Sequence, residues 1–225
     1  MSLLKVPFLV SIMGCMHAVM TPPTHTPPKS EQLPPAGLEL VAPWFPPFDL
    51  RDHDHCRLQT SQRYRDPNYT DLVAFSTPAA ALSLGTTPIF LCGWALNLAG
   101  TLFRVACYHA LGRQFTFELS IRENHRLVTT GPYALVRHPS YTGAILSGMG
   151  ALLAHLSRGS WVMECLNLHG LGVRRRWICV SAASIAALAL VPRMNKEDRM
   201  LKKHFGKDWE DWKSAVPYRL FPGVY

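Results

Sequence analysis

Residues 125–143 of this 225-residue chain, HRLVTTGPYALVRHPSYTG, gather polar side chains at the entry of an apolar segment. An Arg-His-Pro run and two tyrosines offer positive charge, hydrogen bonds and stacking surfaces, and each proline removes a backbone donor and fixes the local turn. One interpretation is a polar helix cap at a membrane surface. A plain cap requires neither two tyrosines nor Arg-His-Pro, so we interpret the stretch as a candidate binding site.

Two further charged features lie outside this stretch. Arg193 and Glu197, followed by Asp198, come directly after the last apolar segment. Their spacing of four places them on one helix face, where the simplest interpretation is an ordinary ion pair. Arg104 lies inside an apolar segment, where a charge is costly and is a functional candidate by default. Snorkelling of Arg104 to the cytosolic surface is the alternative.

Four apolar segments must position these side chains, at residues 6–20, 87–109, 141–157 and 177–191. Charged residues make up only 17% of the chain, against about 25% in soluble domains. The second segment has about 23 residues, and a helix of that length extends about 35 Å, enough to cross a bilayer. The chain is therefore predicted to be an all-α, polytopic membrane helix bundle of about four spans.

Several residues mark the expected helix ends and contacts. Thr87-Pro88 begins the second segment, Pro192 is predicted to stop the fourth, and Gly206 to end the helix that follows. In the third segment, small residues offer a close packing face: Gly143, Ser147, Gly148 and Gly150.

The chain divides into two predicted units, 1–86 and 87–225. The first contains an apolar run at 6–20, which we interpret as a retained anchor rather than a signal peptide because no A-x-A-like cleavage site follows. A Pro-rich and then polar loop continues to residue 86. It includes a sequon at Asn68, usable only in the lumen, and the group His53–Cys56, which no second cluster completes as a metal site. No metal ligand set is predicted elsewhere, and the six cysteines are interpreted as small buried hydrophobic residues.

The distribution of positive charge predicts the orientation. With four crossings, the side that carries both termini holds thirteen Lys and Arg residues, and the opposite side holds nine. The positive-inside rule therefore places the C-terminal tail in the cytosol, although the triplet Arg174–Arg176 counts against this orientation. The tail after residue 192 is amphipathic, aromatic and basic, as in interfacial helices. Because no nucleic-acid-binding motif accompanies the net charge of +8, the expected partner is the lipid bilayer and not nucleic acid.

Three motifs in this order, separated by a membrane hairpin, resemble the isoprenylcysteine carboxyl methyltransferase family. The three motifs are LVTTGPYALVRHPSYTG, the Arg193–Glu197-Asp198 group, and LKKHFGKDWEDWKSAVPYRLFPG. The stretch LGRQFTFELSIRENHRLVT, just upstream of the first motif, also fits the family. The resemblance covers about residues 87–225. It implies methyl esterification of a C-terminal prenylated cysteine, a step of CaaX processing, with S-adenosyl-L-methionine as methyl donor. The implied location is the endoplasmic reticulum membrane, with a cofactor pocket that faces the cytosol between the loop before the third span and the C-terminal tail.

The resemblance also implies roles for individual residues. Arg193 would meet the substrate, and Arg104 is the second candidate for that catalytic role. The cofactor would be held by Glu118, His125, Arg126, Leu127, Val128, Tyr133, His138, Pro139, Ser140, Tyr141 and Glu197. The substrate carboxylate is ionised at neutral pH, so the reaction requires no general base, only alignment and the exclusion of water.

Three alternatives stay open at this point. A membrane methyltransferase that acts on a phospholipid amine, or on another small lipophilic acceptor, would share these motifs but would need a base for an amine. The ending VPYRLFPGVY also resembles sterol reductases, which use NADPH. A non-enzymatic relative, with the polar insert around residues 50–70 in place of a span, is the third.

Overall fold

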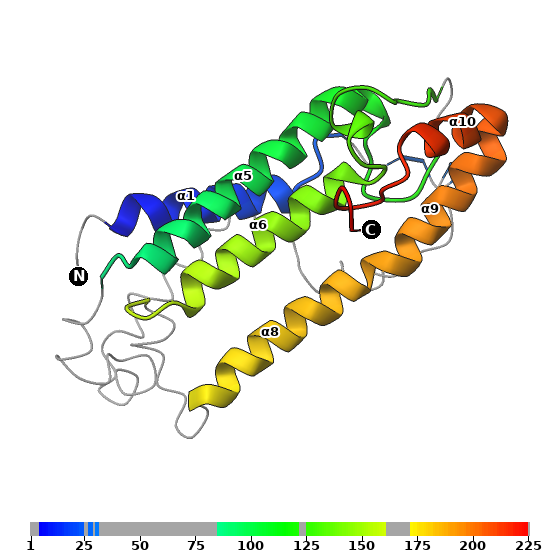
Figure 1. The fold of residues 1–225 in the computed structure, drawn as a ribbon. Coiled ribbons are helices and arrows are strands. Elements are labelled where there is room, and N and C mark those ends of the chain that lie inside the picture. The colour runs from blue at the N-terminus through cyan, green and yellow to red at the C-terminus, as the bar shows by residue number, and fades with distance from the viewer. Residues whose placement is uncertain are drawn as a thin grey trace.

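The computed structural model describes residues 5–24, 27–28, 30–31, 85–121, 125–160 and 172–224, and within 172–176 only the backbone. Across these ranges all regular structure is helical, and no strand is present (Figure 1). The all-α prediction is thus confirmed for the described part of the chain. The predictions for His53–Cys56, the Asn68 sequon and the side chains of Arg174–Arg176 lie outside the described residues, as do Cys56 and Cys165.

Helix α5, Pro88–Leu111, begins where the sequence predicted it. The Thr87 hydroxyl caps the helix by accepting a hydrogen bond from the Phe90 backbone N–H at 3.2 Å, and Pro88 occupies the first position. The helix ends at Gly112, whose φ of +53° lies in the left-handed region that favours glycine.

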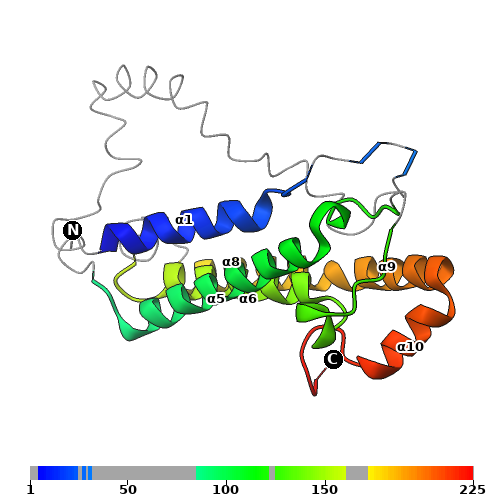
Figure 2. The same ribbon diagram turned by 90° about the horizontal axis from the view of Figure 1, so that it is seen from above.

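Helix α6, Pro139–Leu156, lies along α5 over most of its length (Figures 1 and 2). Small residues allow this approach: a Cβ atom on Gly150 would lie 2.3 Å from the Asn97 backbone nitrogen, and one on Gly143 would lie 2.8 Å from the Gly100 carbonyl oxygen. Ser147 belongs to the same seam. Gly148 does not, because a Cβ atom there would meet nothing within 4 Å, so its predicted place in the packing face is wrong.

Helix α1, Val6–Met20, is part of the same bundle and packs on α5 and α6. The Phe8 ring meets Phe90 and Trp94 edge-on at 6.1 and 5.0 Å between centroids. The Trp94 indole N–H donates to the Ser11 hydroxyl at 3.2 Å. The predicted apolar segment at 6–20 is therefore a helix, and aromatic contacts fix it to the domain that carries the candidate site.

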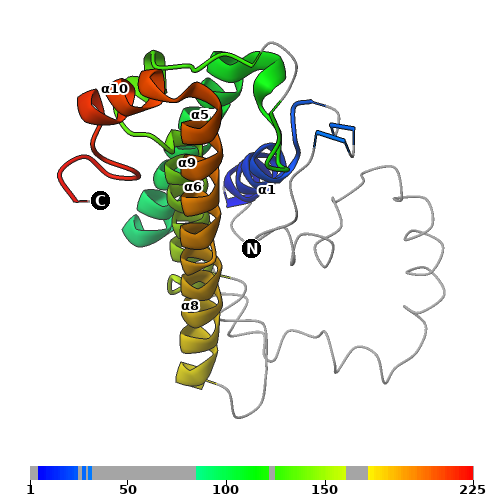
Figure 3. The same cartoon turned by 90° about the vertical axis from the view of Figure 1, so that its right-hand side faces the viewer.

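Helices α8, Gly172–Leu188, and α9, Leu190–Phe205, follow one another almost in line, and the shorter α10, Lys207–Ala215, turns away after them (Figures 1 and 3). The prediction that Pro192 stops the helix is wrong, because α9 runs through it. Proline lacks the N–H that would bond to the Leu188 carbonyl, and its effect is limited to a one-residue break at Ala189. Gly206, with a φ of +54°, ends α9 as predicted.

Two helical segments are long and apolar enough to cross a membrane, Pro88–Gln114 and Trp177–Phe205, and α1 is a shorter apolar helix. Large apolar side chains point outward from α8, with Trp177 66%, Ile185 67% and Leu188 67% exposed. So broad an apolar surface indicates a membrane protein. Four crossings, with α1 and α6 also spanning, stay a prediction.

The cysteine prediction is confirmed only in part. Cys15 and Cys107 are buried, whereas Cys92 is exposed on α5 and Cys179 is half-buried on α8. Cys92 and Cys179 lie on the two helical segments that could cross a membrane. A cysteine there can be surrounded by lipid, so an apolar sequence around it does not require burial inside the protein.

Candidate active site

The hairpin of α6 and α8–α9 brings the two predicted parts of the site together. The Tyr141 hydroxyl, in the first turn of α6, accepts a hydrogen bond from Arg193 Nε at 2.7 Å and donates one to Glu197 Oε2 at 2.8 Å. A cationic and an anionic side chain of α9 therefore share one hydroxyl from another helix. Arg193 also donates to the Phe117 carbonyl, which ties it to the loop after α5.

His138 lies directly beside this group. Its ring stacks on Tyr141, with centroids 5.6 Å apart and planes 19° apart. Its Nδ1 is 3.7 Å from Glu197 Oε2. The His138 side chain is buried, but Glu197 keeps 28% of its side chain exposed, so a ligand can reach this carboxylate.

Asp198 forms the structural centre behind the site. Its carboxylate is 3.1 Å from Arg137 Nη1, 3.1 Å from His138 Nε2 and 3.4 Å from Arg219 Nη2. A buried carboxylate requires such partners, and these fix the Arg-His-Pro run against α9. Arg137 and Asp198 were expected only as members of motifs, and Arg219 carried no prediction of its own. The sequence did contain one indication of this ion-pair cluster. Asp198 directly follows Glu197, and neighbouring residues of a helix face different directions, so Asp198 needs a partner other than Arg193.

The segment after α10 closes the same region through its backbone. The N–H groups of Arg137 and His138 donate to the carbonyls of Tyr218 and Arg219, both at 2.9 Å. The Thr142 hydroxyl donates to the Leu220 carbonyl at 2.7 Å. The motif VPYRLFPG therefore holds the loop before α6 in place.

One stripe of α9 organises the remaining predicted residues. Arg193, Glu197, Leu201 and Phe205 recur every four residues and share a face. Below the polar pair, Leu201 and Phe205 pack against an apolar cluster that also contains Cys107, Leu127, Val128, Tyr133, Trp209, Trp212 and Val216.

Tyr133 and His125 occupy different parts of that apolar end. The Trp212 indole N–H donates to the Tyr133 carbonyl at 3.2 Å. Burial raises the pKa of the Tyr133 phenol well above its ordinary value, so the phenol stays neutral. The His125 ring packs on Phe205 and His204, with centroids 5.8 and 6.5 Å apart.

Other predicted cofactor residues hold less direct positions. Pro139 is buried in the first turn of α6. The Arg126 side chain is exposed, and its backbone N–H donates to Gln114 Oε1. Glu118 is half-buried, and its side chain has no hydrogen bond or ion pair with the residues described. The structure therefore does not bring the Glu118 carboxylate into the Tyr141–Glu197 group.

Arg104 joins three helices at the back of the site. Its Nε donates to the Tyr108 hydroxyl at 2.7 Å and to the Val19 carbonyl at 3.1 Å. Its Nη1 donates to the Ser140 carbonyl and hydroxyl, both at 2.9 Å. The guanidinium thus links α1, α5 and α6 directly before Tyr141, and its predicted contact with substrate stays a prediction.

Residues 91–177 match the model of the "Isoprenylcysteine carboxyl methyltransferase (ICMT) family". Protein-S-isoprenylcysteine O-methyltransferase B of Arabidopsis thaliana is 28% identical over 127 residues, 56% of this chain and 55% of that protein. Protein-S-isoprenylcysteine O-methyltransferase of Dictyostelium discoideum is 27% identical over 145 residues, 64% of this chain and 53% of that protein. The chain thus spans about half the length of these relatives.

A 7-dehydrocholesterol reductase of Xenopus laevis is also 26% identical over 108 residues, 46% of this chain but only 18% of that protein. The family model and the two methyltransferases agree with each other and with the motifs around Tyr141. Residues 91–177 are therefore similar to the isoprenylcysteine carboxyl methyltransferase family, the family that the sequence motifs resemble.

Proposed function

We propose that this protein transfers a methyl group from S-adenosyl-L-methionine to the C-terminal carboxylate of a prenylated cysteine. The observation that carries the proposal is the Arg193–Tyr141–Glu197 arrangement. The reaction joins an anionic acceptor to a cationic donor, so its site must hold ligands of both charges side by side. Arg193 and Glu197, held on the two sides of one hydroxyl, provide this pair of charges.

The residues present fit the proposed cofactor. The Glu197 carboxylate is partly exposed and suits a cationic ligand, and His138 and Tyr141 add hydrogen-bonding groups and a stacked pair of rings. The apolar cluster around Tyr133, Leu127 and Val128 offers surfaces against which a nucleoside packs. When bound, S-adenosylmethionine supplies an electrophilic methyl group on a sulfonium centre.

The work left to the protein is alignment and desolvation. A main-chain carboxylate ionises well below neutral pH, at about 3.3–3.7 in free peptides, so no residue of the site has to remove a proton. The Arg193 fork suits a carboxylate and would orient it toward the Glu197 side. Since His138, Arg137 and Asp198 are buried beneath the pair, the protein side of the site excludes water.

The surroundings agree with a lipid-anchored substrate. The exposed apolar side chains of α8 lead along the helix toward α9, where Arg193 lies. A prenyl chain next to this surface would exchange lipid contacts for equally apolar protein contacts. We assign the methyltransferase domain to residues 87–225. By the positive-inside rule the site faces the cytosol, and the family resemblance favours the endoplasmic reticulum.

Two other functions are separated from this proposal by specific observations. An amine acceptor, as in phospholipid methylation, would need a base, whereas the Tyr141 hydroxyl that binds Glu197 also binds Arg193, whose guanidinium suits an anion. The similarity to a 7-dehydrocholesterol reductase favours NADPH as the alternative cofactor. Photocrosslinking of radiolabelled S-adenosylmethionine, in competition with NADPH, distinguishes these two cofactors.

The direct test uses the full chain in lipid nanodiscs, labelled S-adenosylmethionine and an S-farnesylcysteine acceptor. Arg193→Gln and Glu197→Gln are each expected to lower kcat/KM on the order of a hundredfold, because a displaced carboxylate or methyl donor loses alignment. Lys203→Gln and Asp211→Asn, both exposed on α9 and α10, are the matched controls. Absence of ester formation by the intact protein, or equal activity in the variants and controls, contradicts the proposal.

A further inference from the structure

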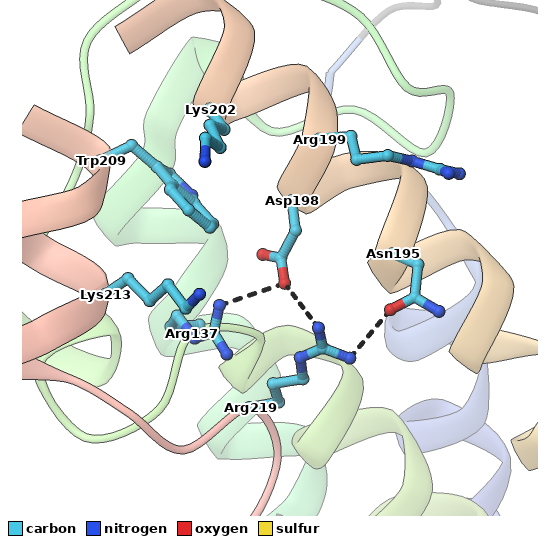
Figure 4. A pocket seen from close by; sticks show the side chains of 8 residues that line it. All are labelled: Arg137, Asn195, Asp198, Arg199, Lys202, Trp209, Lys213 and Arg219. Carbon is cyan, nitrogen blue, oxygen red and sulfur yellow. Dashed lines mark hydrogen bonds and ion pairs between the residues drawn. The ribbon is translucent and has the colours of Figure 1, made fainter. Parts of the chain in front are cut away.

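A polar pocket lies on a different face of α9 from the Arg193–Glu197 stripe. It is a pocket of about 330 Å³ between α9, α10 and the segment that carries Arg219 (Figure 4). This volume lies at the lower end of the range for small-ligand pockets, about 300–1,000 Å³. Five cationic side chains line it: Arg137, Arg199, Lys202, Lys213 and Arg219.

The charges in this pocket are only partly balanced. Asp198 supplies one negative charge that Arg137 and Arg219 share, and Glu210 pairs with Lys202 at 2.8 Å. The hydrogen bond from Lys202 lowers the pKa of the Glu210 carboxyl, so this carboxyl is ionised at neutral pH. Arg199 and Lys213 form no ion pair with any residue in the described ranges, which leaves the pocket with an excess of positive charge.

Trp209 supplies an independent indication of a ligand. Its side chain is 96% buried by its neighbours, with 4% exposed, and it lines the pocket. Its indole N–H has no hydrogen-bond partner among the described residues. A buried donor without an acceptor is costly, and a ligand oxygen would satisfy it. Lys213 Nζ and the Arg137 guanidinium lie 5.4 and 5.9 Å from the same ring.

We propose that this pocket binds a phosphoryl group. Its lining presents arginine forks, lysine ammonium groups and an indole N–H from several directions, and a tetrahedral oxyanion accepts hydrogen bonds in several directions. The pocket lies beyond the apolar length of α8, where the helix becomes polar, so with α8 across a bilayer the pocket would lie near the lipid headgroups. The same chemistry is offered by an anionic phospholipid headgroup and by free phosphate.

Asp198 gives such a ligand a path to the candidate active site. One carboxylate oxygen faces Arg137 and Arg219 on the pocket side, and the other lies 3.1 Å from His138 Nε2. A bound phosphoryl group would share the two arginines with Asp198, and would therefore act on the residue that positions His138.

The test compares two double variants of the full chain in detergent micelles. Arg199→Gln/Lys213→Gln removes two pocket cations, one from α9 and one from α10. Lys203→Gln/Lys207→Gln removes two exposed cations from the same helices outside the pocket. Radiolabelled inorganic phosphate and short-chain phosphatidic acid are the two probes, with phosphatidylcholine as the lipid control.

The pocket variant is expected to bind the preferred probe on the order of tenfold more weakly than the wild type, and the control variant within about twofold of it. Trp209→Phe, which keeps the ring but removes the N–H, is expected to weaken binding severalfold. Binding of phosphatidic acid alone identifies a lipid headgroup as the source, and binding of both probes identifies the phosphoryl group itself. Equal losses in the two double variants indicate general surface attraction and overturn the proposal, as does failure of the wild type to bind either probe.

Discussion

Gly150 on α6 lies so close to α5 that a single methyl group tests the packing of the bundle. The added Cβ of Gly150→Ala would be 2.3 Å from the Asn97 nitrogen and 2.6 Å from the Gly93 carbonyl oxygen. Both are backbone atoms, so no side chain can move aside. Relief to an ordinary separation of about 3.5 Å requires the helices to move apart by about 1 Å, and a gap of this size forfeits a quarter to a half of each dispersion contact.

Overpacking of this kind costs about 1–3 kcal/mol, which corresponds to a fall of roughly 3–10 °C in the apparent Tm of a chain of this size. The assay is thermal unfolding of the detergent-solubilised protein, followed by tryptophan fluorescence. Gly148→Ala on the same helix is the control, because a Cβ there meets nothing within 4 Å. Both substitutions replace glycine by alanine within a helix, so both gain the same helix propensity, up to about 1 kcal/mol, and only the clash differs between them. Equal Tm values for the two variants would refute the close approach of α5 and α6.

Three further predictions concern the site and its supports. Asp198→Asn removes the charge that balances Arg137 and is expected to cost about 3–5 kcal/mol, visible as a lower yield and Tm; an unchanged Tm contradicts the central role of Asp198. Tyr141→Phe is expected to lower kcat/KM for methyl transfer roughly ten- to a hundredfold and to lower the Tm by less than Asp198→Asn does, since it removes hydrogen bonds to two charged groups but leaves their charges in place; wild-type kinetics would contradict this. Arg104→Lys is expected to lower the Tm while the folded enzyme keeps its KM for the acceptor; a raised KM at an unchanged Tm would instead show that Arg104 touches substrate.

Hydrophobic segments and capping residues predicted most of the helices. Thr87-Pro88 and Gly206 mark real helix ends, because a cap depends on local backbone groups that the sequence specifies directly. Pro192 misled the prediction, since the cost of one missing hydrogen bond was met by a break of one residue at Ala189. Gly148 was misassigned because small size alone does not tell which residues face a neighbouring helix.

The site was predicted as two separate stretches, but their contacts could not be derived from spacing. Arg193 and Glu197 share a helix face, yet the group between them is the hydroxyl of Tyr141 from a different helix. Likewise, the buried position of Asp198 depends on Arg219, which is close to it only because the chain turns back after α10. Such long-range partners follow from tertiary packing, and local periodicity carries no information about them.

The backbone pairing between residues 137–138 and 218–219 also has a consequence for biosynthesis. Residues 217–220 follow every described helix in the chain, so they are synthesised after all of those helices. Until then the Arg-His-Pro run lacks two of its backbone acceptors, and Asp198 lacks Arg219. A nascent chain that stops after α10 would therefore lack these contacts, and the proposed site would be complete only once this segment has been synthesised.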